Sequence, residues 1–175
     1  MKTKIFRFFS LLTVCSFLFL GGCQSTPSPQ GVTLKVQRVL SGQAVEVVNL
    51  QQSNSTSRVQ LIGLSAPELR QRPWGETAKE RLQEMIGDKP VLLESDLEPK
   101  DQFDRQLAYI WQDGKLLNEQ LLKEGWALFR PRSLNRKYDR RLEHAQEYAR
   151  VMGLGIWSPD QPLRIPPEQF RQQYR

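Results

Sequence analysis

The stretch Arg58-Val59-Gln60-Leu61-Ile62-Gly63-Leu64-Ser65-Ala66-Pro67-Glu68 decides the fold that this sequence predicts. It has the pattern of a β-strand over residues 58–64, with Val59 and Leu61 on the same face. The Ala66-Pro67 step then reads as a turn that ends the strand. Glu68 follows on a loop held by a rigid element, which is where catalytic acids and bases are commonly placed. The stretch therefore predicts a strand that delivers a carboxylate to a cleft.

The segments on either side of this stretch predict a small β-barrel with separate helices. Alternating apolar residues indicate two strands between residues 32 and 50, and two more at 90–94 and 107–111. Apolar residues at helical spacing indicate helices at 75–86, 117–123 and 136–152. The resulting order is βββαββαα, which is typical of an α+β fold built on a five-stranded OB-type β-barrel with three helices.

The N-terminus predicts a lipoprotein signal peptide over residues 1–22. Three basic residues precede an uncharged apolar run of 13 residues, Phe8–Leu20, which is shorter than the roughly 20 residues that a transmembrane helix needs. Leu20-Gly21-Gly22-Cys23 resembles a bacterial lipobox, whose cleavage would leave Cys23 as an acylated first residue. The alternatives are an ordinary signal peptide cut nearby and a mis-assigned start. Acyl chains on Cys23 would hold the protein in the bacterial cell envelope, outside the cytoplasm, on either membrane or at the cell surface.

The rest of the chain divides into three parts by composition. Residues 23–31 read as a flexible Ser/Pro/Gln tether, and residues 32–158 are long enough for one domain with its own core. Residues 159–175 belong to a proline-rich segment that reads as an extended tail. We expect this protein to be a monomer.

Charge and residue usage exclude several kinds of site. Without the three basic residues of the signal peptide, 22 basic and 19 acidic residues leave a net charge of +3, which argues only weakly for an anionic partner. Cys15 lies in the signal peptide and Cys23 would be lipidated, so the domain has no cysteine for a disulfide or a metal. His144 is the single histidine, which excludes a multi-histidine zinc site and most Ser-His-Asp triads.

Five short motifs stand in order along the chain. They are VLSGQAV at 39–45, VQLIGLSAPE at 59–68, DQFDRQLAYI at 101–110, DGKLLN at 113–118 and GLGIW at 153–157. Together they resemble the staphylococcal nuclease (thermonuclease) family. The resemblance implies calcium-dependent hydrolysis of phosphodiesters. It also implies two aspartates and a backbone carbonyl on the metal, a glutamate that activates water, and two arginines that clamp the phosphate.

Three of the five polar positions that the resemblance assigns have lost their charge. Gln43 and Ser65 stand where the metal-binding aspartates are implied, and Gln60 stands where the first arginine is implied. Glu68 is retained as the base and Arg105 as the second arginine. Fewer ligand charges weaken calcium binding, and losing one transition-state donor costs about 10²–10³ in rate. We therefore expect weak or lost hydrolysis and no cofactor, with Ca²⁺ needed only if activity is retained.

Nearby charged residues leave alternatives open at this site. Arg58 lies on the same strand face as Gln60 and could reach the same groove, although an exposed residue at the strand start is the simpler interpretation. Further carboxylates near the motifs are Glu46, Asp101 and Asp104, the last of which could replace a turn glycine. For Glu68 and Arg105, contact with a ligand and an ion pair between the two are equally compatible with the sequence.

A basic stretch, residues 130–141, suggests a second functional surface. Its candidates for binding a polyanion are Arg130, Arg132, Arg136, Lys137, Arg140 and Arg141. Like charges four residues apart, and basic residues at a helix start, destabilise a helix locally. Nucleic acid, anionic lipid headgroups or a polyanionic envelope polymer would offset that cost. The alternative is a solvated helix face relieved by Asp139 and Glu143.

Three functions are therefore compatible with the sequence. The first is a membrane-anchored, thermonuclease-like protein with a degenerate site that binds nucleic acid or another polyanion. The second is an active extracytoplasmic nuclease with a rearranged site. The third is an envelope protein that binds a protein or polysaccharide partner through the barrel groove.

Overall fold

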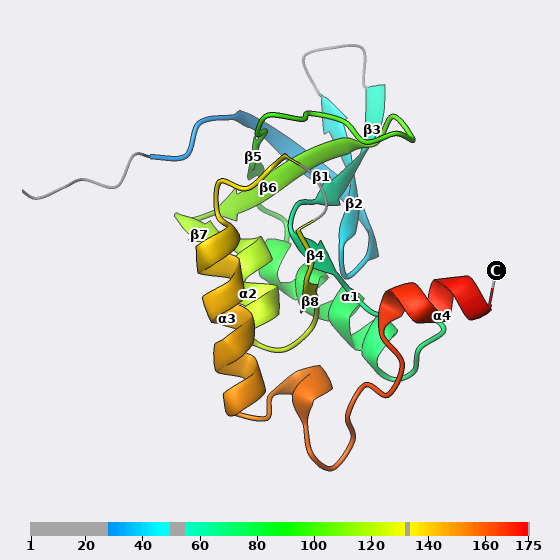
Figure 1. The fold of residues 1–175 in the computed structure, drawn as a ribbon. Coiled ribbons are helices and arrows are strands. Elements are labelled where there is room, and N and C mark those ends of the chain that lie inside the picture. Colours follow the sequence, from blue (N-terminus) through cyan, green and yellow to red (C-terminus); the bar gives the residue numbers. More distant parts are fainter. Residues whose placement is uncertain (1–27, 50–54, 132–133, 175) are drawn as a thin grey trace, which may run out of the picture.

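A computed structural model shows the fold and describes residues 28–49, 55–131 and 134–174 (Figure 1). Within these residues, five strands form a closed β-barrel: β1 (Val32–Ser41), β2 (Ala44–Asn49), β3 (Ser55–Leu61), β5 (Val91–Glu94) and β6 (Gln106–Gln112). Antiparallel pairing runs in the order β3-β2-β1-β5-β6, and parallel pairing between β3 and β6 closes the barrel. The predicted α+β fold with a five-stranded OB-type barrel is confirmed.

The remaining elements are short strands and helices outside the barrel. They are β4 (Leu64–Ser65), β7 (Lys115–Leu116), β8 (Leu128–Phe129), α1 (Trp74–Ile86), α2 (Leu117–Lys123), α3 (Asp139–Val151), the 3₁₀-helix η1 (Gly155–Trp157) and α4 (Pro167–Gln173). Helices α1, α2 and α3 gather at one end of the barrel, below it in Figure 1. No helix among the described segments is long and apolar enough to cross a bilayer.

The core lies between the barrel interior and these three helices. Alternation in β2 and β3 turns Val45, Val47 and Val59 inward, where each is at most 1% exposed. Strand β6 is buried continuously from Ala108 to Gln112, because the barrel interior covers one of its faces and Tyr138 packs against Tyr109 and Trp111 on the other. Because Val59 pairs with Gln106, the end of β3 lies beside the start of β6, so the turn after β3 and the loop before β6 meet on one side of the barrel.

Three details differ from the sequence-based expectation. The expected helix 136–152 begins only at Asp139, so Arg136 and Lys137 precede α3 and do not form like-charge pairs along it. The expected strand 58–64 is interrupted, because β3 ends at Leu61 and a turn through Gly63, with φ of 78°, leads into β4. The expected extended tail is also wrong in its last part, because residues 167–173 form α4. Pro167 stands in the first turn of α4, where a missing N–H costs nothing.

A buried asparagine ties α2 to the barrel. Asn118 is fully buried, and its Nδ2 donates to the Ile62 carbonyl at 2.8 Å. Its Oδ1 accepts from the Ile110 N–H at 2.9 Å. The side chain thus satisfies a carbonyl at the end of β3 and an N–H in the middle of β6, and it fixes the turn that leads toward Glu68.

We expect Asn118→Leu to lower the free energy of unfolding by about 2–4 kcal/mol, because two buried backbone groups lose their partners. Urea denaturation followed by tryptophan fluorescence measures the change. The matched control is Gln120→Leu on the same helix, which should shift stability by less than about 0.5 kcal/mol. Equal effects of the two substitutions would contradict a structural role for the Asn118 hydrogen bonds.

Candidate active site

The structure brings the five positions singled out in the sequence to one side of the barrel. Gln43 lies in the β1–β2 turn, and its Oε1 accepts from the Ala66 N–H at 2.8 Å. Gln60 on β3 pairs with Ala44 next to that turn, and its Oε1 accepts from Arg105 Nη1 at 3.4 Å. These contacts join the turn, β3, the chain after β4 and the loop before β6 into one cluster.

The loop that carries Glu68 is held by a neighbouring glutamine. The Glu68 N–H donates to Gln71 Oε1 at 2.9 Å, and the Gln71 N–H donates to the Glu68 carbonyl at 2.7 Å. Helix α1 begins against the same loop, since a Cβ atom on Gly75 would lie 2.0 Å from the Glu68 carbonyl oxygen. Only glycine permits this approach, so the start of α1 fixes the backbone of the half-buried Glu68.

Glu68 is paired with an arginine from the C-terminal helix. Arg171 Nη1 on α4 donates to Glu68 Oε1 at 2.5 Å, and its Nη2 lies 3.3 Å from Ser65 Oγ. The guanidinium therefore stands between the position of the base and one of the metal-ligand positions. The sequence analysis missed Arg171, and no local pattern in the tail distinguishes it.

Arg105 is held by the loop that precedes β6. Its Nε donates to Asp101 Oδ2 at 2.6 Å. Burial raises the pKa of Asp101, but hydrogen bonds from the side chain and N–H of Arg105 and from the Phe103 N–H outweigh it and lower the pKa below its ordinary value. The alternative of an ion pair between Glu68 and Arg105 is therefore wrong, because each has a different partner.

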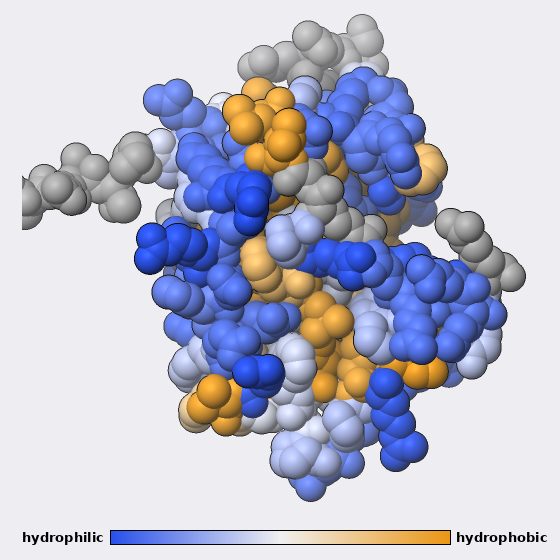
Figure 2. Space-filling model, viewed as in Figure 1, coloured by the Kyte–Doolittle hydropathy of each residue, from blue (hydrophilic) through white to orange (hydrophobic). Residues whose placement is uncertain are grey.

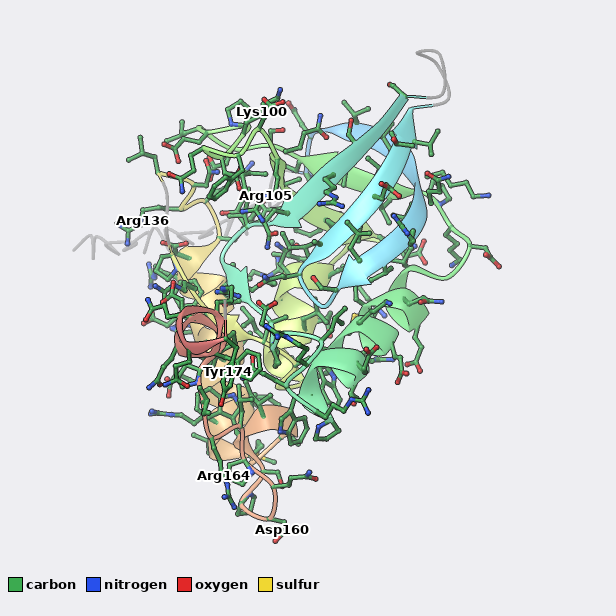
Figure 3. All side chains as sticks on the ribbon, turned by 90° about the vertical axis from the view of Figure 1, so that its right-hand side faces the viewer. Lys100, Arg105, Arg136, Asp160, Arg164 and Tyr174 are labelled. Carbon is green, nitrogen blue, oxygen red and sulfur yellow. The ribbon has the colours of Figure 1, made fainter. Side chains whose placement is uncertain are left out.

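An exposed aromatic ring accompanies Arg105. Phe103 is 67% exposed, and the Arg105 guanidinium carbon lies 5.3 Å from its ring centroid. Apolar side chains reach the surface among hydrophilic ones near the top of Figure 2, by the loop before β6. Figure 3 shows Arg105 beside the barrel strands. The pair presents a flat apolar ring next to a cation.

The other charged residues near the motifs do not reach this cluster through any described contact. Glu46 pairs with Arg38 across β1 and β2 at 3.1 Å. Asp104 pairs with Lys100 at 2.6 Å and has φ of 59°, as expected for a residue in place of a turn glycine. Arg58 is exposed on β3, opposite Glu46.

The calcium ion that the resemblance implies does not fit these residues. Gln43 and Ser65 are neutral, and the Gln43 oxygen already accepts the Ala66 N–H. Glu68 is the single carboxylate among the implied ligand and base positions, and Arg171 contacts it. The described residues contain no group of three or more His, Cys, Asp or Glu that could hold a metal. Calcium sites need several oxygen ligands, preferably charged, and this cluster does not offer them.

Most of the basic stretch is neutralised within the fold. Arg136 pairs with Asp139, Arg141 with Glu119, Lys137 with Glu94 and Arg130 with Glu168. Arg140 is exposed on α3 and has no ion-pair partner among the described residues. Arg132 and Cys23 lie outside the described residues. An open pocket of about 660 Å³ beside α3 is lined in part by Lys123, Arg140, His144 and Tyr148.

Lys137 belongs to a buried network around Glu94. Glu94 is 1% exposed and accepts from Lys137 Nζ at 2.5 Å, Trp111 Nε1 at 2.7 Å and the Tyr138 hydroxyl at 3.0 Å. Burial raises the pKa of Glu94, but these hydrogen bonds outweigh it and lower the pKa below its ordinary value. Lys137 and Tyr138 therefore fasten the start of α3 to β5 and β6.

Comparison with known proteins relates the chain to nucleases. Residues 58–159 match the family model described as staphylococcal nuclease homologue. The chain is 32% identical to a thermonuclease of Staphylococcus intermedius, with 77% of this chain and 81% of the relative covered. It is 34% identical to a thermonuclease of Staphylococcus hyicus, with 72% and 76% covered. It is 27% identical to an uncharacterized endonuclease of Haemophilus influenzae, with 93% and 85% covered.

We expect Glu94→Gln to lower the free energy of unfolding at pH 7 by about 1–3 kcal/mol, because the buried acceptor loses its charge. Since the pKa of Glu94 is depressed in the folded state, its contribution is present above the unfolded pKa of about 4.3 and is lost as the pH falls below it. The free energy of unfolding of the variant should therefore fall less between pH 7 and pH 3 than that of the parent.

Urea denaturation from pH 7 to pH 3 measures both effects. The exposed Glu143→Gln substitution on α3 removes the same charge and serves as the control. If the two variants had the same pH dependence, the Glu94 network would not be the source of the acid sensitivity.

Proposed function

The chain belongs to the staphylococcal nuclease family, and on that premise we propose that it binds nucleic acid while hydrolysing it weakly or not at all. The observation that carries the proposal is the pairing of both retained charged residues. Glu68 is bound to Arg171, and Arg105 is bound to Asp101. A base in an ion pair and a phosphate-binding arginine with its own carboxylate are poorly placed for catalysis.

Physical chemistry supports weak hydrolysis. A general base must reach the water that it activates, and Arg171 already donates to one of the two carboxylate oxygens of Glu68. The charge that develops on phosphate in the transition state needs fixed cations, and Gln60 supplies none. Losing one such donor costs about 10²–10³ in rate, and a divalent metal would be lost as well.

The pair of Phe103 and Arg105 supports binding of single-stranded nucleic acid. An exposed ring offers a stacking surface that accepts any base, at about 1–3 kcal/mol per base. The adjacent guanidinium can contact phosphate, and Asp101 keeps it in place. Relatives described as thermonucleases and endonucleases make nucleic acid the first ligand to test.

One observation favours a second candidate, an active nuclease with a rearranged site. Arg171 brings a guanidinium within hydrogen-bond distance of Ser65 and Glu68, so a second arginine is present even though Gln60 is neutral. In that case the α4 arginine would take the role of the missing clamp.

We also propose that acylated Cys23 anchors the protein in the bacterial envelope, outside the cytoplasm. The lipobox-like Leu20-Gly21-Gly22-Cys23 supports this proposal, and the Ser/Pro/Gln tether would separate the barrel from the bilayer. Stable attachment needs more than one acyl chain, which a lipidated N-terminal cysteine provides.

We expect purified residues 24–175 to bind a single-stranded DNA or RNA oligonucleotide without calcium-stimulated cleavage. Phe103→Ala should weaken binding about tenfold through lost stacking, and affinity should fall with added salt. Fluorescence anisotropy measures binding, and gel analysis with calcium or chelator measures cleavage. Tyr148→Ala, an exposed ring on α3, is the matched control and should have little effect.

Three outcomes would change this proposal. Robust calcium-dependent cleavage that Glu68→Gln abolishes would establish the active nuclease instead. Weaker binding with Tyr148→Ala than with Phe103→Ala would move the ligand to the pocket beside α3. Absence of both binding and cleavage would favour an envelope protein with a protein or polysaccharide partner.

We expect Cys23→Ala in the full-length chain to move the protein from the membrane fraction to the soluble fraction of bacterial cells. Fractionation and incorporation of labelled palmitate measure the change. Cys15→Ala is the matched control, because Cys15 lies inside the predicted signal peptide and should leave both readouts unchanged. If the Cys23→Ala protein still incorporated labelled palmitate and stayed in the membrane fraction, Cys23 would not be the anchor.

A further inference from the structure

The C-terminal helix α4 contacts the loops that carry the candidate active site. Arg171 binds Glu68 and Ser65, as described above. The Ile165 carbonyl before the helix accepts from Gln71 Nε2 at 2.7 Å, and Gln71 also holds the Glu68 loop. The tail thus contacts the candidate site at Glu68 and at Gln71, which holds the Glu68 loop in place.

Residues of the same C-terminal segment also bind two arginines near the site, Arg130 and Arg70. Glu168 forms an ion pair with Arg130. The Tyr174 carbonyl accepts from Arg70 Nη2 at 2.6 Å, and the guanidinium carbon of Arg70 lies 5.7 Å from the Phe170 ring centroid. The Glu168 carboxylate therefore contacts Arg130, and the Tyr174 carbonyl and the Phe170 ring contact Arg70, which lies two residues after Glu68.

We propose that α4 is an internal strap that competes with an anionic ligand for the site. The Tyr174 carbonyl binds Arg70 and the Glu168 carboxylate binds Arg130, where phosphate oxygens of a nucleic acid would otherwise bind. Arg171 of the same helix pairs with Glu68 and so ties α4 to the loop that carries the candidate base. The inference rests on the proposed nucleic-acid binding, because the strap matters only if an anionic ligand enters.

The contacts are suited to displacement by a ligand. The side chains of Arg171 and Glu68 are 31% and 34% exposed, and partly exposed ion pairs contribute little to stability. Pro167 is the single buried residue of this seven-residue helix. A strap held in this way lowers the apparent affinity for ligand by the fraction of molecules that are open.

The tail provides matched controls for the competing effect of charge. Arg164 and Asp160 are exposed in the same tail, and Figure 3 shows both at the lower end of the molecule, away from Arg105. Arg171→Met and Arg164→Met each remove one positive charge from the tail. Simple electrostatics predicts that both substitutions weaken binding to a polyanion. The strap instead predicts that Arg171→Met strengthens binding to the oligonucleotide, while Arg164→Met does not.

We expect Arg171→Met in residues 24–175 to bind a single-stranded oligonucleotide about 3- to 10-fold more tightly than the parent, while Arg164→Met binds equally or more weakly. Glu168→Gln should likewise tighten binding more than Asp160→Asn does. Anisotropy titrations measure the affinities. Thermal unfolding by circular dichroism checks that each variant is folded.

Hydrogen exchange of the α4 amides provides a second readout. In the parent, saturating oligonucleotide should speed exchange at Phe170 and Tyr174, whose N–H groups donate to the Pro166 and Phe170 carbonyls at the two ends of α4. Equal affinity of parent and Arg171→Met, with unchanged exchange, would overturn the strap while leaving the proposed function intact. Weaker binding of Arg171→Met would also overturn it and make Arg171 a ligand contact. If no variant bound the oligonucleotide, the proposed function and the strap would both fall.

Discussion

The carboxamide of Asn118 is the constraint on which the rest of the structure depends. This fully buried side chain satisfies the Ile62 carbonyl, just after β3, and the Ile110 N–H within β6, and the parallel pairing of these two strands closes the barrel. Both groups would otherwise be buried without partners. Because Ile62 begins the turn toward Ser65 and Glu68, the same two hydrogen bonds that seat α2 also place the candidate site.

The site is organised around internal neutralisation. Where the family resemblance implies two aspartates and a calcium ion, this chain has Gln43 and Ser65, and a guanidinium from α4 contacts the retained Glu68. With Gln43 and Ser65 neutral, Glu68 is the single acid among these positions, and the Arg171 guanidinium provides the opposite charge next to it.

The basic stretch shows how a run of charge can have a structural role. In sequence it looks like a surface for a polyanion, because like charges cluster at a helix start. In the fold, Lys137 reaches the buried Glu94, and Arg136 and Arg141 have acidic partners on α3 and α2. Arg130 instead faces α4, which links it to the candidate site. The stretch is therefore several local pairings with different roles.

By itself, the sequence determined the barrel, three of its helices and the grouping of Gln43, Gln60, Ser65, Glu68 and Arg105, since periodicity and motif order report local burial and family likeness. It placed Asp104 in a glycine-like turn for the same reason. Only the tertiary structure decided that Arg171 meets Glu68, 103 residues away, and that the end of the tail is a helix. Ion pairs between distant segments depend on how elements pack, which no local pattern encodes.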